Sequence, residues 1–228
     1  TLRFIHARQL RPGATAKVKT IRRIDSSNLE IEFETDLPAD IGVGDAIENA
    51  DWFPAVTFRN NTVRNNRARG SLFTTPRPVL VEGNTFDHSS GSAILLAGDA
   101  NGWYESGACD GVVIRKNIFR DNLTSRYQFT NALISICPTA PAIGKPEGFF
   151  YHRNVRIEDN VFETFDVPLV SAVSTDGVLF RSNTVRYNKN YPGWEKPPFN
   201  FRHCANVQIE KNTVYDADGK PVIWSTDL

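Results

Sequence analysis

The sequence predicts an all-β protein: a right-handed parallel β-helix of about six coils, preceded by a small antiparallel β-barrel-like module. Two observations lead to this prediction. After residue 50, an eight-residue pattern occurs six times, and the six copies align with one another without gaps. The first 50 residues instead alternate apolar and polar residues. We therefore expect residues 1–50 to form part of the small module, truncated at its start, and residues 51–228 to form the parallel β-helix.

The recurring pattern reads valine, any residue, an apolar residue, two mostly polar residues, asparagine, any residue, and then valine or phenylalanine. The six copies are VTFRNNTV, VLVEGNTF, VVIRKNIF, VRIEDNVF, VLFRSNTV and VQIEKNTV, which start at Val56, Val79, Val112, Val155, Val178 and Val207. Side chains alternate between the two faces of a strand, so the valine and the apolar residue two positions later share one face. Copies spaced 23 to 43 residues apart are typical of stacked repeats.

The asparagine of each copy falls at the bend between two short strands, where its side chain can bond to backbone groups and tolerate a turn. In a stack with matched register, each asparagine can also bond to the next. The sequence thus predicts an internal ladder of six asparagines, namely Asn61, Asn84, Asn117, Asn160, Asn183 and Asn212.

A third apolar strand is expected after each pair, which makes three strands per coil. These segments are SLFTT, AILLA, LISIC, LVSAV, FNFRH and VIWST, which start at Ser71, Ala93, Leu133, Leu169, Phe199 and Val222. In contrast, AKVKTIRRI and LEIEFETDL in the first 50 residues alternate apolar and polar residues, as a half-exposed antiparallel sheet does.

The composition removes several classes of function. Lys and Arg number 26 and Asp and Glu number 26, so the net charge of zero gives no electrostatic reason to expect nucleic acid or an anionic membrane as a partner. No apolar run approaches the roughly 20 residues of a membrane span. The three cysteines, Cys109, Cys137 and Cys204, lack a CxxC spacing. A metal site built on them is not expected, and a disulfide stays open.

Two neighbouring coils carry long insertions after the third strand, GDANGWYESGACDG from Gly98 and PTAPAIGKPEGFFYHRN from Pro138. Long insertions also precede the third strand in the coils of Asn117 and Asn183. Insertions at matching positions of a solenoid project on one face, which is often the binding face. The insertions are rich in aromatic and charged residues, a combination that suits the apolar ring face and the hydroxyls of a sugar. We therefore expect a cleft for carbohydrate.

Glycoside hydrolysis needs two carboxyl groups, one acting as acid and the other as base or nucleophile. Asp99 and Glu105 are the catalytic candidates because both lie in the first insertion, with Asp87 and Asp110 as further nearby carboxylates. For each alone, a structural role as a turn cap or a solvated carboxylate is an equal alternative. The candidates for binding substrate are Trp103, Tyr104, Arg67, Arg69, Asp87 and His88.

The stretches RNNRARGSLFTT from Arg64 and SGSAILLAGDANGWYESGACDGVVIRKNIF from Ser90 resemble the bacterial α-1,3-galactosidases of glycoside hydrolase family 110. The resemblance extends over roughly residues 40–228. It implies a parallel β-helix with an inserted β-barrel module, and exo-acting removal of terminal α-1,3-linked galactose by an inverting mechanism. It also implies a glycan of the blood group B or Galα1-3Gal type as partner, no metal or other cofactor, and a bacterial, extracellular or periplasmic location.

The sequence departs from that family in one respect. Members carry essential aspartates in an Asp-Asp motif on a coil before the barrel module, and this chain contains no Asp-Asp pair. The chain also starts at Thr1 and has no methionine, so we expect it to be the C-terminal part of such an enzyme. Two alternatives stay open at this point: a polysaccharide lyase or epimerase on the same fold, and a non-catalytic carbohydrate-binding solenoid.

Overall fold

The computed structural model describes residues 1–224, which are all-β: they form 21 strands and no helix. Accordingly, no helix among these residues is long and apolar enough to cross a membrane. The strands of the first 50 residues are β1 (Leu2–His6), β2 (Arg11–Ala16), β3 (Val18–Arg23), β4 (Leu29–Phe33) and β5 (Ala46–Asn49). β1 pairs antiparallel with both β2 and β5, and β3 forms an antiparallel hairpin with β4. The antiparallel pairing expected from the alternating pattern is confirmed.

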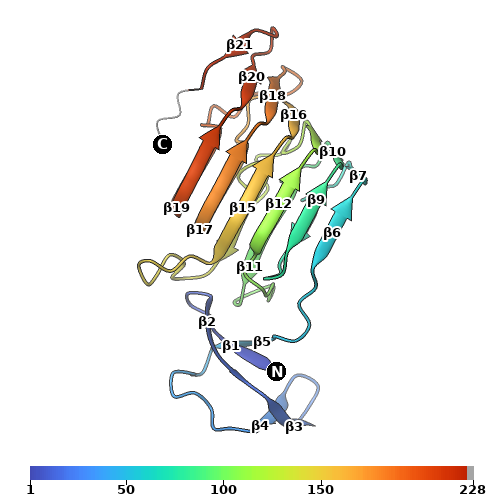
Figure 1. Cartoon of the computed structure of the whole chain (residues 1–228). Helices are drawn as coiled ribbons and strands as arrows, with labels where there is room; N and C mark the ends of the chain where they lie inside the picture. Colours follow the sequence, from blue (N-terminus) through green and yellow to red (C-terminus); the bar gives the residue numbers. More distant parts are fainter. Residues whose placement is uncertain (225–228) are drawn as a thin grey trace.

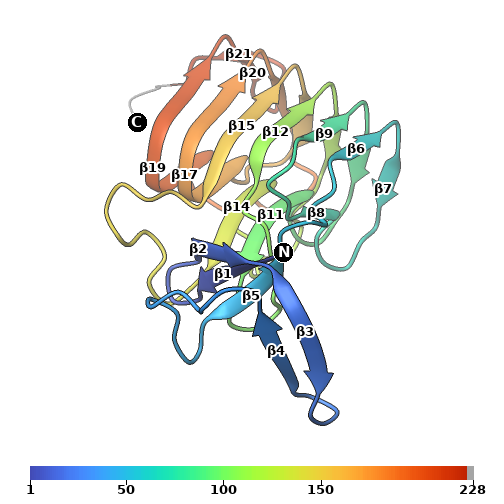
Figure 2. The same ribbon diagram turned by 60° about the horizontal axis from the view of Figure 1, so that its bottom comes forward.

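From Val56 onward the strands pair almost entirely in parallel, and successive copies of the pattern lie side by side in three rows (Figures 1 and 2). The first row contains β6 (Val56–Arg59), β9 (Val79–Glu82), β12 (Asp110–Arg115) and β15 (His152–Glu158). The second row contains β7 (Thr62–Arg64), β10 (Thr85–Asp87), β13 (Ile118–Arg120), β16 (Val161–Thr164), β18 (Thr184–Tyr187) and β20 (Thr213–Tyr215). The third row contains β8 (Ser71–Phe73), β11 (Ile94–Asp99) and β14 (Ile134–Thr139).

Two long strands join the third row to the first. β17 (Val170–Arg181) pairs with β14 through its first residues and with β15 through its last ones. β19 (Phe199–Glu210) pairs with β17 along its whole length. Ser174 and His203, near the middle of these strands, have φ of 51° and 52°, so each strand changes direction there. The first and third rows therefore form one curled parallel sheet, opposite the second row.

The expectation for the last segment, VIWST, is wrong where the structure describes it. Only Val222 of this segment is in a strand, β21 (Pro221–Val222), and this strand runs antiparallel to β20 at the end of the second row. Lys220 instead returns the chain through a tight turn, with its backbone N–H donating to Asp216 Oδ1 at 2.8 Å. Ser225 and Thr226 lie outside the described residues.

The core lies between the rows and is built from the apolar positions of the pattern. The valine of each inner copy and the apolar residue two positions later are buried, as in Val112 and Ile114. Phenylalanines at the last position stack from one copy to the next: the ring centroids of Phe86 and Phe119 are 5.2 Å apart, and those of Phe119 and Phe162 are 4.7 Å apart. Parallel stacking of equivalent rings thus fixes the register between copies.

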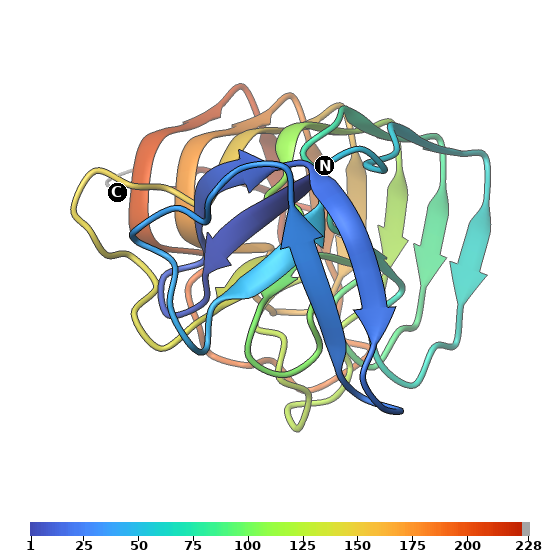
Figure 3. The same cartoon turned by 90° about the horizontal axis from the view of Figure 1, so that it is seen from below.

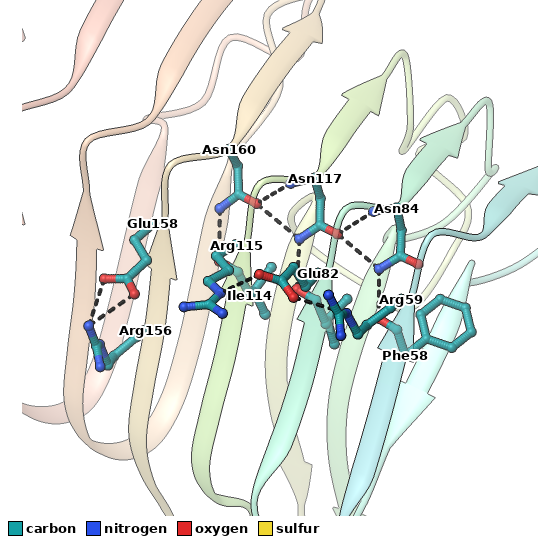
Figure 4. Close-up of polar contacts among 11 residues, drawn as sticks. Phe58, Arg59, Glu82, Asn84, Ile114, Arg115, Asn117, Arg156, Glu158 and Asn160 are labelled. Atoms are coloured by element: carbon teal, nitrogen blue, oxygen red, sulfur yellow. Dashed lines mark hydrogen bonds and ion pairs between the residues drawn. The ribbon is translucent and has the colours of Figure 1, made fainter.

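The predicted asparagine ladder is confirmed (Figure 4). Asn117 Oδ1 accepts the backbone N–H and the side-chain amide of Asn84, both at 2.9 Å. Asn117 in turn donates its backbone N–H and side-chain amide to Asn160 Oδ1, both at 3.0 Å. Its second amide hydrogen goes to the carbonyl of Val81. The same bonds connect Asn61 to Asn84, Asn160 to Asn183, and Asn183 to Asn212.

The bend itself is made one residue earlier than the sequence suggested. The residue before every ladder asparagine has a φ between 54° and 67°, and only Gly83 among them is a glycine. The others are Asn60, Lys116, Asp159, Ser182 and Lys211. A left-handed conformation costs roughly 1–2 kcal/mol for a residue with a Cβ. The ladder bonds hold these bends in place.

A row of alternating charges runs along the outer face of the first row of strands (Figure 4). Glu82 lies between Arg59 at 3.0 Å and Arg115 at 2.8 Å. Glu158 likewise accepts from Arg156 at 2.9 Å and from Arg181 at 3.0 Å. By strand register the sequence of this row is Arg59, Glu82, Arg115, Glu158, Arg181 and Glu210. The two inner carboxylates, Glu82 and Glu158, are buried. Water therefore competes little with the arginines for hydrogen bonds to them.

The module of residues 1–50 packs against the ends of the third-row strands (Figures 1 and 3). Asn101, in the insertion after β11, donates its side-chain amide to the Ala7 carbonyl at 3.0 Å. Ala142, in the insertion after β14, donates its backbone N–H to the Arg8 carbonyl at 2.7 Å. As expected, these two insertions leave adjacent strands at the same edge, and they connect the stack to the module.

Candidate functional site

A small cavity of about 60 Å³ lies where the module meets the insertion after β11. The module contributes Arg3 and Glu48, and the stack contributes Asp99, Glu105 and Tyr151. Tyr104, which the sequence predicts as a binding residue, also lines it, and apolar side chains form most of the remaining wall, so three carboxyl groups and two phenols lie around one space. The two predicted catalytic candidates are therefore brought to the same cavity.

Asp99 is the last residue of β11 and organises the insertion that follows. Its two carboxylate oxygens accept backbone N–H groups, Oδ1 from Asn101 at 2.7 Å and Oδ2 from Trp103 at 2.5 Å. Its own N–H donates to the Glu105 carbonyl at 3.0 Å, which closes the loop on itself. The carboxylate is buried. Asp99 thus has the contacts of a loop cap as well as a place on the wall of the cavity.

The sequence predicts both Glu105 and Arg69 as site residues, and their side chains face each other. Arg69 precedes β8, and Glu105 lies in the insertion after the neighbouring strand β11. The closest guanidinium nitrogen of Arg69 is 3.8 Å from Glu105 Oε1, and the Glu105 side chain is 23 % exposed. Arg69 also lies over the ring of Phe129, 5.8 Å from its centroid. The arginine is held by the aromatic ring and can orient a carboxylate or a sugar hydroxyl at this position.

Tyr151, one of the aromatic residues of the second insertion, is a central residue of the cavity, although the sequence did not single it out as a site residue. Its buried ring lies against the backbone of Gly98, where an added Cβ would be only 2.2 Å from Tyr151 Cε1. Burial raises the pKa of the Tyr151 phenol, and the carboxylates of Glu48, Asp99 and Glu105 and the Cys109 thiol add to the increase. The phenol is therefore a permanent neutral donor beside three carboxyl groups.

Glu48 is the second residue that sequence reasoning missed. It lies on β5 and is buried, with Oε1 3.3 Å from an Arg3 guanidinium nitrogen. Burial raises the pKa of the Glu48 carboxyl, while the charge of Arg3 and the Gly107 N–H partly offset this increase. A raised pKa keeps a carboxyl closer to its protonated form, as a general acid requires. No repeated pattern surrounds Glu48 in the sequence, so nothing there distinguished it.

Asp87 and His88 are not part of this cavity. They lie before β11, whereas Asp99 ends it, and the six residues of this strand alone span about 16 Å of extended chain. His88 Nδ1 contacts Asp87 Oδ1, and its Nε2 is 3.9 Å from Asp121 Oδ2. Asn188 and Asn190 bind the same Asp121 carboxylate. These contacts connect the turn after β10 to the insertion after β18.

The aromatic residues of the insertions divide into two groups. Trp103, Tyr104 and Tyr127 are exposed, whereas Trp194 and Tyr151 are buried in the body. Trp103 is 86 % exposed, so its indole is free to stack on a ligand. Arg67 is exposed, and its carbonyl accepts the side-chain amide of Gln128 at 3.3 Å. All three cysteines are free. Within residues 1–224, no group of three or more His, Cys, Asp and Glu side chains is placed to hold a metal.

His152 lies next to Tyr151 and gives a prediction about pH. It is fully buried, and its Nδ1 accepts the Cys109 N–H at 3.0 Å. Burial lowers the pKa of His152 to about 3, from 6.5. Below pH 6.5 the histidine takes up a proton in the unfolded chain but not in the folded chain. The contribution of His152 to the free energy of unfolding is therefore fully present above pH 6.5 and decreases as the pH falls toward 3. The decrease from this group approaches about 1.4 kcal/mol per pH unit.

Urea unfolding at several pH values between 7 and 4 would measure this slope. In the variant His152→Asn, whose side-chain oxygen can still accept the Cys109 N–H, we expect the dependence to be shallower by that amount. Equal slopes in the two proteins would contradict the assignment.

Comparison with known proteins identifies proteins that are similar in sequence to this chain. The model of the GLAA-B beta-barrel domain II matches residues 1–47. An α-1,3-galactosidase B of Akkermansia muciniphila is 62% identical over 213 residues, which is 93% of this chain and 27% of that protein. This chain is related to the α-1,3-galactosidases. The α-1,3-galactosidase B of Parabacteroides distasonis is 46% identical over 93% of the chain and 36% of its own length. An α-1,3-galactosidase A of Bacteroides fragilis is 38% identical over 96% of the chain and 36% of its own length.

The chain thus spans about a quarter to a third of the galactosidases that it matches. The similarity confirms the resemblance that the insertion after β11 indicated. It covers the module of residues 1–50 as well as the stack, since the domain model and the longer alignments together extend over both.

Proposed function

We propose that this chain is part of a bacterial glycoside hydrolase that removes terminal α-1,3-linked galactose from glycans with inversion. The observation that supports this most directly is the 62% identity to an α-1,3-galactosidase B over 93% of the chain. The proposed partner is a glycan with a non-reducing α-galactose, of the Galα1-3Gal or blood group B type. The proposed location is extracellular or periplasmic, and the reaction proposed here uses no metal or other cofactor.

The proposal includes the finer description of the fold. We infer that residues 51–228 form a right-handed parallel β-helix of about six coils, and that residues 1–50 form a separate barrel-like module. Parallel pairing of all six copies in the first and second rows, and of the first five third strands, supports the first inference. The second is supported by the match of residues 1–47 to a barrel domain.

In the proposed site, Glu105 and Asp99 are the catalytic carboxyl groups. Trp103 and Tyr104 stack on the sugar ring, and Arg69 orients Glu105 or a hydroxyl. Arg67, at the outer edge, contacts more distant parts of the glycan. Asp87 and His88, at the far end of β11, support the turn and the insertion rather than the galactose itself.

A non-catalytic carbohydrate-binding role is the second candidate, and one observation favours it. Both oxygens of Asp99 already accept loop N–H groups, which is the role of a cap rather than of an acid or base. In that case the exposed Trp103 would bind sugar without any catalytic function for the carboxylates.

The two candidates predict different results for Glu105→Gln and Asp99→Asn. In an enzyme that contains this chain, we expect each substitution to lower kcat on Galα1-3Gal by about 10²- to 10⁴-fold, because a general acid or base contributes roughly that much. Glu147→Gln, an exposed carboxylate in the insertion after β14, is the matched control. The anomeric proton signals of released galactose, followed by NMR, measure turnover and stereochemistry together.

Early release of β-galactose supports inversion. Near-normal turnover in both variants, with the Glu147 control also normal, would remove these carboxylates from catalysis. Saturation transfer to galactose without turnover would favour the binding role.

A further inference from the structure

A second hollow lies on the outer face of the third row. It is a groove of about 390 Å³ that crosses β14 and the first halves of β17 and β19. Neither the asparagine ladder nor the cavity beside Tyr151 includes its residues. The apolar positions of these strands point inward to the core, so the alternate positions form the floor of the groove.

The floor presents hydrogen-bonding groups in register. Ser171 pairs in register with Asn200, so one hydroxyl and one amide lie side by side on two adjacent strands. Neighbouring strands are about 4.8 Å apart. These two groups can donate to and accept from neighbouring hydroxyls of one sugar residue. Ser135, the register partner of Ser171 on β14, is buried, and its hydroxyl is already bonded to Ser92 and to the backbone of Ala132. Pro168 and Pro197 add apolar surface at the edge where the strands begin.

The charges of the groove have one sign. Lys196 and Arg202 line it, and no carboxylate does. Within residues 1–224, neither cation takes part in an ion pair. The Lys196 ammonium lies 5.5 Å from the centroid of the Trp194 ring, which restricts its position. Arg202 is on the outer side of β19, beside Val173 in register. A chain of zero net charge therefore holds these two cations over one hydroxyl and one amide.

We propose that this groove binds an acidic sugar residue of a glycan through its carboxylate or sulfate ester. Arg202 and Lys196 bind the anionic group, and Ser171 and Asn200 bind ring hydroxyls. The identification of the ligand as a glycan rests on the proposed function. The site itself is distinct from the galactose cavity, which is lined by three carboxyl groups.

The two sites share one sheet face, which favours their use by a single glycan. Cys137 lies on the floor of the groove and pairs with Ala97, two residues before Asp99. From strand spacing and rise per residue, Asp99 and Arg202 are roughly 16 Å apart. A short oligosaccharide can cover that distance. The groove would therefore select glycans that carry an acidic residue near the terminal galactose.

Titration of the 228-residue chain with four probes tests this proposal. The probes are glucuronic acid, galactose 6-sulfate, neutral galactose and inorganic sulfate, each followed by NMR shifts of the chain. We expect at least one of the acidic sugars to bind more tightly than both galactose and sulfate, and the one that binds identifies the anionic group. Arg202→Gln and Lys196→Gln should each weaken that binding by about tenfold. Arg23→Gln, which removes an exposed cation from the distant β3 hairpin, is the matched control and should have no effect.

Three results would overturn the proposal. They are equal binding of acidic and neutral sugars, binding of both acidic sugars no tighter than that of sulfate alone, and unchanged affinity in both groove variants. Turnover of Galα1-3Gal by an enzyme that contains this chain is measured separately. The binding assay can therefore contradict the groove proposal while the turnover assay supports the galactosidase proposal. The two assays can also give the opposite pair of results.

Discussion

Replacement of Asn117 by alanine is expected to lower the free energy of unfolding by about 3–5 kcal/mol. The side chain is fully buried, and its Oδ1 accepts two hydrogen bonds from Asn84. Alanine leaves both donors without an acceptor and also leaves the Val81 carbonyl without its donor. Each buried polar group that loses its partner costs roughly 1–3 kcal/mol. The variant also keeps the left-handed bend at Lys116 with fewer bonds to hold it, because the backbone N–H of residue 117 still donates to Asn160 but its side-chain bonds are gone.

Urea unfolding of Asn117→Ala beside Asn61→Ala would measure this effect. Asn61 is the exposed first member of the same ladder, and water can replace its bonds. We therefore expect Asn61→Ala to lower the free energy of unfolding by less than about 1 kcal/mol. Similar losses in the two variants would show that the ladder is not what holds the copies in register.

Gly98→Ala is expected to destabilise the chain by about 3 kcal/mol and to disrupt the cavity beside the module. The backbone of Gly98 is not left-handed, so the effect is purely steric. The new Cβ would lie 2.2 Å from Tyr151 Cε1 and 2.5 Å from its Oη. Overpacking of a buried site typically costs 1–3 kcal/mol or more. Tyr151 cannot move outward freely because the module covers it, and the contacts of Glu48 and Glu105 with the cavity depend on its position.

A double-mutant cycle with Tyr151→Leu isolates this contact. The smaller side chain removes the clash, so Gly98→Ala should cost much less in that background. Gly42→Ala is the control, because a Cβ there meets no atom within 4 Å. If Gly98→Ala is as mild as Gly42→Ala, Tyr151 is not packed on this strand as described.

The features that repeat were predictable from the sequence, and those that occur once were not. The inward valines and the ladder asparagines recur in one frame, so each copy supports the interpretation of the others. Glu48 and Tyr151 occur in no shared pattern, and their proximity depends on how the module packs against the insertions. Asp87 and His88 are near Asp99 in sequence, but a whole extended strand separates them in space. Proximity along the chain indicated a shared site only where a turn, as between Asp99 and Glu105, brings the chain back.

The alternating row of arginine and glutamate imposes a parity rule on this stack. Each copy contributes one charge to the row, from Arg59 to Glu210, and its sign is opposite to that of both neighbours. Gain or loss of a single inner copy would place two like charges side by side, at a position where the inner carboxylates are buried. Gain or loss of two adjacent copies would keep the alternation intact. Such a stack can therefore grow or shrink in its interior in even steps while keeping each inner carboxylate between two arginines.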